Sequence, residues 1–184
     1  AENDLPKQSR SIKTYVSKFG PLIGLILLTT VLTFLSDKLM TLNNIMNIAR
    51  QSSINAILAI GMLLPILTAG IDLSVGSILA VSIMVMGIVS VTMGFSPILG
   101  LLACLVVGAG FGLLNGLLLT KLRLPHPFIS TLGTMNIARG IALIITAAAP
   151  IAGFPYLIQF LGREFVGPIP VSFLLVIVVY IIFH

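Results

Sequence analysis

The sequence is poor in charged residues. Only 8% of its 184 residues are charged, ten Lys or Arg against five Asp or Glu, whereas 58% are hydrophobic. A soluble globular domain carries about 25% charged residues, so these few charges cannot cover a water-soluble fold of this size. The composition therefore excludes a soluble enzyme, a disordered tail and a nucleic-acid-binding domain, and no nucleic acid partner is expected.

Residues that carry chemistry are also scarce. The single cysteine, Cys104, permits neither an intramolecular disulfide nor a cysteine-based metal cage. His126 and His184 are isolated in the sequence, so neither a zinc site nor a catalytic triad is expected, and no cofactor is predicted. The phosphate-binding pattern GxxxxGK[ST] is absent as well. The chain is not expected to be an enzyme, and any ATP would have to be hydrolysed by a separate subunit.

Apolar runs fill most of the chain. A hydrocarbon core about 30 Å thick requires roughly 20 apolar residues of helix. We predict six membrane spans, over residues 20–34, 54–69, 73–93, 98–120, 128–149 and 171–183. An amphipathic turn over 42–50 should lie in the membrane interface before the second span, and a shorter amphipathic patch is expected over 156–160. The fold class predicted is an all-α polytopic membrane protein.

The first span could instead be a signal peptide, because basic residues precede it. The residues that follow it, Phe34-Leu35-Ser36, do not form a small-x-small cleavage site. A retained helix is therefore the favoured interpretation.

Basic residues set the expected orientation. Lys and Arg in short loops mark the cytoplasmic side, and residues 1–19 contain Lys7, Arg10, Lys13 and Lys18. We therefore predict that residues 1–19 form a cytoplasmic tail and that 20–184 form the transmembrane domain. With six spans, Lys121 and Arg123 return to the cytoplasmic side, in agreement with the same rule.

Small residues recur at every fourth position of the span over 98–120, at Gly100, Cys104, Gly108, Gly112 and Gly116. Such spacing makes a shallow ridge on which another helix backbone can approach closely. We predict that Gly108, Gly112 and Gly116 pack against another helix, and that Asn115 beside them hydrogen-bonds across the ridge.

Asp72 stands in a polar interruption, GIDLSVGS, over residues 70–77. Gly70 and Gly76 let the backbone leave the helical conformation, which at membrane depth is tolerated only where it is packed in protein or lines a cavity. Two roles are open. Asp72 could cap the next helix with help from Ser74, or it could line a path for polar cargo, and both can hold together.

Arg139 lies eleven residues after Phe128, which places it about 16 Å along the expected helix. An arginine near the middle of a membrane is a candidate functional residue. Neighbouring hydroxyl and amide side chains favour a hydrated lining over purely structural hydrogen bonds. We expect Asp72 and Arg139 to face the same hydrated interior, directly or through water. The predicted substrate-path residues are Asp72, Ser74, Asn136 and Arg139.

Three segments carry a family resemblance. ILTAGIDLSVGS (66–77), ISTLGTMNIARG (129–140) and LNNIMNIARQSSINAILAIGM (42–62) closely resemble bacterial ABC-transporter permeases of the ribose type, in the branched-chain amino acid and sugar permease superfamily. The similarity spans essentially the whole chain.

The resemblance implies a larger permease fold of roughly ten helices. The chain would then be its N-terminal portion, stopping before the cytoplasmic loop that engages the ATPase. The implied partners are a cytoplasmic ABC ATPase, a periplasmic sugar-binding protein, a second permease copy or paralogue, and the lipid bilayer of the inner membrane.

The resemblance implies the permease subunit of an ATP-driven, binding-protein-dependent importer for a monosaccharide such as ribose or allose. Substrate would pass by alternating access. Two other functions remain open: a truncated, non-transporting membrane partner or scaffold of a full-length permease, and an ATP-independent channel or carrier.

Overall fold

The computed structural model describes residues 12–67, 70–121 and 126–183, with side chains described from Phe19 onward. The chain divides into two compact units between Asn47 and Ile48. Three residues of the expected cytoplasmic basic regions, Lys7, Arg10 and Arg123, lie outside the described residues, as do His184 and the side chains of Lys13 and Lys18.

The first unit contains α1 (Ile12–Leu35) and the start of α2 (Leu42–Leu67). The hydroxyls of Thr29, Thr30 and Thr33 each donate to the carbonyl four residues earlier, at 2.7–2.8 Å. Because these bonds satisfy the hydroxyls within the helix, an otherwise apolar surface can face lipid.

The expected separation of an interfacial turn over 42–50 from a span over 54–69 is wrong. Both segments belong to one continuous helix, α2. The sequence between Leu42 and Ala59 contains neither Gly nor Pro, so nothing in it ends a helix. The polar residues that suggested a turn occupy one face of the long helix instead.

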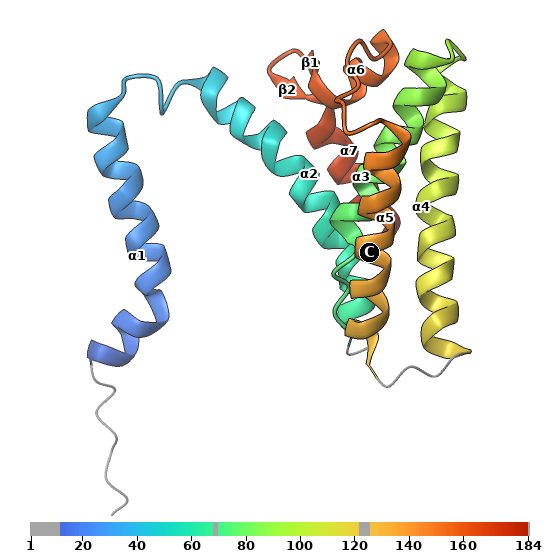
Figure 1. Cartoon of the computed structure of the whole chain (residues 1–184). Helices are drawn as coiled ribbons and strands as arrows, with labels where there is room; N and C mark the ends of the chain where they lie inside the picture. Colours follow the sequence, from blue (N-terminus) through green and yellow to red (C-terminus); the bar gives the residue numbers. More distant parts are fainter. Residues whose placement is uncertain (1–11, 68–69, 122–125, 184) are drawn as a thin grey trace, which may run out of the picture. The chain divides into compact units, whose positions relative to one another are not determined.

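The second unit is built around α3 (Val75–Gly87), which continues as a π-helical turn, η1 (Ile88–Thr92). It packs against both α4 (Pro97–Thr120) and α5 (Pro127–Ile145), and the three lie side by side in Figure 1. Val81 of α3 and Ala138 and Ala142 of α5 form the buried centre. Small core residues allow the helices to approach closely, as is typical of membrane bundles.

The chain leaves α5 and forms α6 (Tyr156–Arg163), a two-residue ladder and α7 (Val171–Phe183). The ladder pairs β1 (Phe165–Val166) with β2 (Ile169–Pro170) around Gly167, whose φ is +63°. The amphipathic patch expected over 156–160 lies within α6, whereas the ladder was not predicted. The guanidinium of Arg50 on α2 lies 5.9 Å from the Phe165 ring centre.

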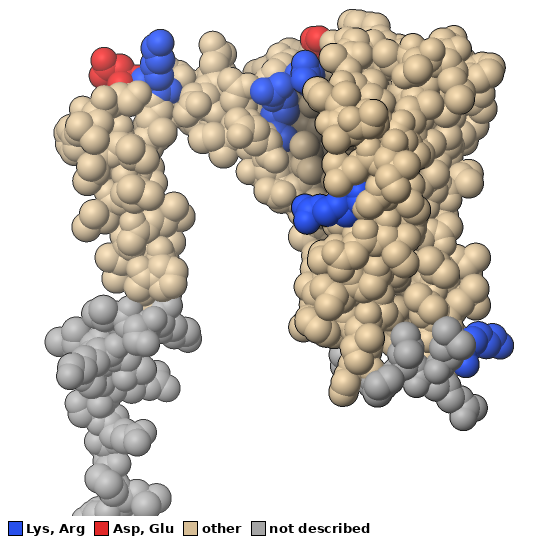
Figure 2. Space-filling view, in the orientation of Figure 1, with Lys and Arg blue, Asp and Glu red and all other residues tan. Residues whose placement is uncertain are grey.

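Within the described residues, four helical segments are long and apolar enough to cross a membrane: Leu42–Leu67, Val75–Thr92, Pro97–Thr120 and Pro127–Ile145. They match the middle four of the six predicted spans. The apolar parts of the other two, Phe19–Leu35 and Val171–Phe183, are shorter. Figure 2 shows the few charged side chains on a surface that is otherwise uncharged, in keeping with an all-α membrane fold in which large apolar side chains face outward.

Candidate functional site

The polar interruption before α3 is a turn held against the start of α5. The Gly70 N–H donates to the Pro65 carbonyl at 2.9 Å. A Cβ at position 70 would lie 3.2 Å from Cγ of Pro127, so glycine allows this close approach. The Thr131 hydroxyl lies 3.3 Å from the Ile71 carbonyl oxygen and 3.1 Å from that of Pro127. The turn is therefore packed in protein, as backbone that leaves the helix at membrane depth requires.

Asp72 organises the entry to α3. Its Oδ1 accepts the Ser74 N–H at 2.7 Å and the Ser74 hydroxyl at 2.5 Å. Ser74 is the N-cap residue of α3, so Asp72 binds the cap residue itself rather than the amides of the first turn. A carboxylate beside a helix N-terminus is also favoured by the helix dipole.

Two buried side chains extend this cluster across the bundle. The Asn115 amide on α4 donates to the Ser74 hydroxyl at 2.9 Å, and the Thr134 hydroxyl on α5 donates to Oδ1 of Asn115 at 2.6 Å. Ser74, Asn115 and Thr134 expose 0%, 6% and 1% of their surface. We call the chain of hydrogen bonds Thr134–Asn115–Ser74–Asp72 the polar relay. It confirms that Asn115 hydrogen-bonds to other segments of the bundle.

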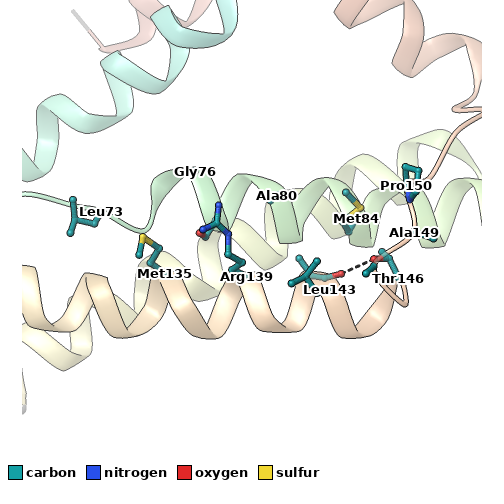
Figure 3. Close-up of a pocket in the computed structure, with 13 residues that line it drawn as sticks. Leu73, Gly76, Ala80, Met84, Met135, Arg139, Leu143, Thr146, Ala149 and Pro150 are labelled. Atoms are coloured by element: carbon teal, nitrogen blue, oxygen red, sulfur yellow. Dashed lines mark hydrogen bonds between the residues drawn. The ribbon is translucent and has the colours of Figure 1, made fainter.

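An open groove of about 580 Å³ runs between α3 and α5. Figure 3 shows the Arg139 side chain reaching from α5 toward α3 near Gly76, and nothing lies within 4 Å of a Cβ built at Gly76. We call this the α3–α5 groove. Its lining consists of Leu73, Gly76, Ser77, Ala80, Met84, Met135, Arg139, Ala142, Leu143, Thr146, Ala148, Ala149 and Pro150.

Arg139 is exposed to the groove and makes no hydrogen bond or ion pair with the described part of the chain. It is twelve residues from Pro127 and six from Ile145, about 18 Å and 9 Å along the helix axis. The guanidinium therefore lies well inside the span. Its five donors face a groove of mainly apolar side chains with the Ser77 hydroxyl among them.

Asp72 and Arg139 do not pair directly, since the described residues contain no ion pair between them. The Ile71 carbonyl contacts Thr131, which precedes Arg139 by eight residues, or about 12 Å along α5. Asp72 is not a groove-lining residue. The structure brings Asp72 and Ser74 together in the polar relay and places Arg139 in the groove.

The other predicted residues fall in separate places. The Asn136 amide donates to the Leu132 carbonyl of its own helix at 2.9 Å, and Asn136 does not line the groove. A Cβ at Gly108 would lie 3.6 Å from the Ser82 hydroxyl oxygen of α3, whereas nothing described lies within 4 Å at Gly112 or Gly116. Packing of Gly108 on α3 is thus seen, and packing of the other two stays a prediction.

Sequence reasoning missed the closest helix contact and the relay partner Thr134. A Cβ at Gly100 would lie 3.0 Å from Cβ of Ser90 and 3.2 Å from the Met86 carbonyl. The small residues at every fourth position indicated this face of α4, but they did not indicate that Gly100 makes the closer contact. Thr134 was visible only as one polar residue of α5. Of the residues that the structure describes, no group of three His, Cys, Asp or Glu side chains is placed to hold a metal ion.

A bundle of apolar helices with a polar turn before α3 and a groove that contains Arg139 is typical of a membrane protein that handles polar groups, and sequence comparison identifies its family. Residues 44–184 match the family described as branched-chain amino acid transport system / permease component. Because this match covers most of the chain, the protein belongs to that family of transport permeases.

Its relatives include sugar import permeases. The chain is 39% identical over 170 residues to the ribose import permease protein RbsC of Bacillus subtilis, covering 91% of this chain and 52% of that protein. It is 37% identical over 175 residues to the D-allose transport system permease protein AlsC of Escherichia coli, covering 93% and 53%. The chain thus spans about half the length of these curated relatives. No solved structure matches it.

Proposed function

We propose that this chain forms part of the translocation path of an ATP-driven, binding-protein-dependent monosaccharide importer. The observation that carries the proposal is Arg139, a guanidinium without a protein partner among the described residues, which faces the α3–α5 groove well inside a membrane span. A charged group at that depth costs several kcal/mol unless it is hydrated or paired (about 2.5–3.5 kcal/mol on insertion scales). A permease that moves polar cargo uses such a hydrated position.

The groove offers chemistry that suits a neutral sugar. Arg139 supplies donors to sugar oxygens, and the Ser77 hydroxyl can donate or accept. Ala80, Met84 and Met135 supply apolar surface for the C–H faces of a sugar ring. A ring of fixed charges, which an ion pathway uses, is not found among the described groove residues. The ribose and allose permeases among the relatives support the same substrate class.

The energy would come from a cytoplasmic ABC ATPase, because this sequence has no phosphate-binding GxxxxGK[ST] loop. A periplasmic sugar-binding protein would deliver the substrate. A second permease copy or paralogue in the inner membrane would complete the path, which opens alternately to the two sides. In this arrangement the N-terminus and Lys121 lie on the cytoplasmic side.

Reconstitution tests this proposal. Proteoliposomes should contain the chain, its ATPase and its sugar-binding protein, and the measurement is the uptake of labelled ribose and allose with and without ATP. Uptake that depends on ATP and on the binding protein is expected. Uptake without nucleotide would overturn the ATP-driven mechanism in favour of a channel or carrier. Stable assembly without any uptake would instead identify the chain as a non-transporting partner of a longer permease.

A further inference from the structure

The polar relay joins segments that are distant in sequence. Ser74 and Asn115 are 41 residues apart, and Asn115 and Thr134 are 19 apart. The three side chains belong to the start of α3, to α4 and to α5. The relay therefore connects the α3 entry with both helices that pack on α3.

Asp72 fixes the direction of every hydrogen bond in the relay. The Ser74 hydroxyl donates its single proton to Oδ1 of Asp72. The Ser74 oxygen is then left to accept from the Asn115 amide, and the Asn115 carbonyl accepts from Thr134. Ser74 and Asn115 each have one defined relay partner on each side, and Thr134 has Asn115 alone. Removal of one member therefore leaves a buried neighbour without its partner.

Because it takes part in the relay, Ser74 does not make the hydrogen bond that is usual for a serine at an N-cap. Serine at an N-cap usually accepts a hydrogen bond from an amide of the first turn. Ser74 occupies the N-cap of α3, yet its side chain makes no capping bond. Ser96 at the start of α4 shows the ordinary arrangement, since its side-chain oxygen accepts the Leu99 N–H at 3.3 Å. The Ser74 hydroxyl therefore fixes the α3 entry relative to α4 and α5 and does not cap the helix.

We infer that Asn115 and Thr134 are positioning residues of the translocation path. Through Ser74 they hold the α3 entry, so that Leu73 and Gly76 keep their place in the α3–α5 groove opposite Met135 and Arg139. Neither residue lines the groove, so both act on it through Ser74. The expected effect of these residues on uptake rests on the proposed transport function. Their expected effect on the position of the groove wall does not depend on transport.

The first test measures the groove wall without transport. Leu73→Cys is introduced together with Cys104→Ala, and the rate of modification by a small polar thiol reagent is measured in the assembled protein. Addition of Thr134→Val, which removes one hydroxyl and keeps the side-chain shape, should change that rate by about two- to tenfold, the effect of losing one net hydrogen bond. Thr134→Ser should restore the original rate. Asn115→Leu should change the modification rate of Leu73→Cys in the same direction as Thr134→Val.

A matched control is Ser90→Ala. Ser90 is buried like the relay residues, but its hydroxyl donates only to the Met86 carbonyl of the preceding helical turn, at 2.6 Å. It should leave the labelling of Leu73→Cys unchanged. If Asn115→Leu fails to assemble, the Thr134 pair still decides the result, because Val replaces the Thr134 hydroxyl with a methyl group, whereas Ser keeps the hydroxyl and lacks only the methyl group.

The second test separates positioning from general stability in ATP-driven uptake. Thr134→Val and Ser74→Ala should each raise the KM for sugar with a smaller change in maximal rate, and the double variant should be no worse than the more harmful single variant. If Thr134→Val changes neither the labelling rate of Leu73→Cys nor the KM for sugar, the positioning role of the relay is overturned. Wild-type protein that shows no ATP-driven uptake would overturn the proposed function, and the labelling result would still decide the relay.

Discussion

At the scale of single residues, Asp72 in the turn before α3 and Arg139 within α5 have different tasks. Asp72 is tied to Ser74 by two hydrogen bonds at the α3 entry. Arg139 faces the groove and is bonded to no described residue. The first arrangement stabilises the fold, and the second leaves donors available to a ligand. The sequence placed both charges in apolar surroundings, but it could not show that Arg139 lies about 12 Å along α5 beyond Thr131, which contacts the turn beside Asp72.

Arg139→Gln should therefore impair transport without impairing assembly. A hydrogen bond from a charged donor is worth about 1.5–3 kcal/mol, so uptake at low sugar concentration should fall about tenfold or more. Yield and Tm in detergent should stay close to those of the wild type, because no hydrogen bond or ion pair with a described residue is lost. Arg163→Gln, in the last turn of α6, is the control with the same chemical change. Equal losses in both variants would contradict a role of Arg139 in the groove.

Asp72→Asn and Arg139→Ala should be additive in uptake. Substitutions more than about 7–10 Å apart without shared partners add within about 0.3–0.5 kcal/mol. Thr131, which contacts Ile71 beside Asp72, precedes Arg139 by about 12 Å along α5, and the two charged residues share no hydrogen-bond partner among the described residues. The measurement is the uptake rate of both single variants and the double variant at one sugar concentration. A double variant clearly less harmful than the product of the singles would show that a water-bridged pairing of the two charges operates during transport.

At the scale of elements, the apolar runs predicted the helices well but predicted poorly where one helix ends and the next begins. The interruption before α3 was visible because its polar and glycine residues stand out from apolar neighbours. The expected division of α2 into a turn and a span was wrong because polar residues on one helix face resemble a break in the helix. The absence of Gly and Pro between Leu42 and Ala59 favours one continuous helix instead. The π-helical turn η1 could not be foreseen, since the packing of Gly100 against Ser90 and Met86 depends on contacts between helices.

Gly100 and Gly112 should respond oppositely to alanine. A Cβ at Gly100 would meet Cβ of Ser90 at 3.0 Å, whereas a Cβ at Gly112 meets nothing described within 4 Å. Gly100→Ala should lower the free energy of unfolding by about 1–3 kcal/mol through overpacking. Gly112→Ala should leave Tm unchanged or raise it, since alanine favours a helix by up to about 1 kcal/mol.

Both variants should be measured as the isolated chain in detergent. A comparable loss of Tm in the two would contradict the packing of α3 on α4 described above. The same pair in the assembled complex addresses the remaining prediction for Gly112 and Gly116, because a partner helix on this face would make Gly112→Ala impair assembly while the chain itself stays stable.

At the scale of the whole molecule, the second unit has two ends that should lie on opposite sides of the membrane. The turn at Gly70 lies against Pro127 at the start of α5. A Cβ at Gly87, at the other end of α3, would lie 2.9 Å from the Ile151 side chain, beyond the end of α5. The helices α3 and α5 therefore run in the same direction, as expected when α4 lies between them in the chain and runs back. This alternation was expected from the count of spans, whereas the contacts that define each end join residues far apart in sequence.

The end with Lys121 should be cytoplasmic and the end with Glu164 periplasmic. Lys121 directly follows α4 and Glu164 directly follows α6, and both are exposed, so Lys121→Cys and Glu164→Cys, each with Cys104→Ala, form a matched pair. An impermeant thiol reagent added to intact cells should label position 164 and leave position 121 unmodified until the membrane is opened. The physical reason is that Lys and Arg in short loops are retained on the cytoplasmic side. Labelling of position 121 from outside would reverse the orientation of this unit, and labelling of both positions would contradict the odd number of crossings between them.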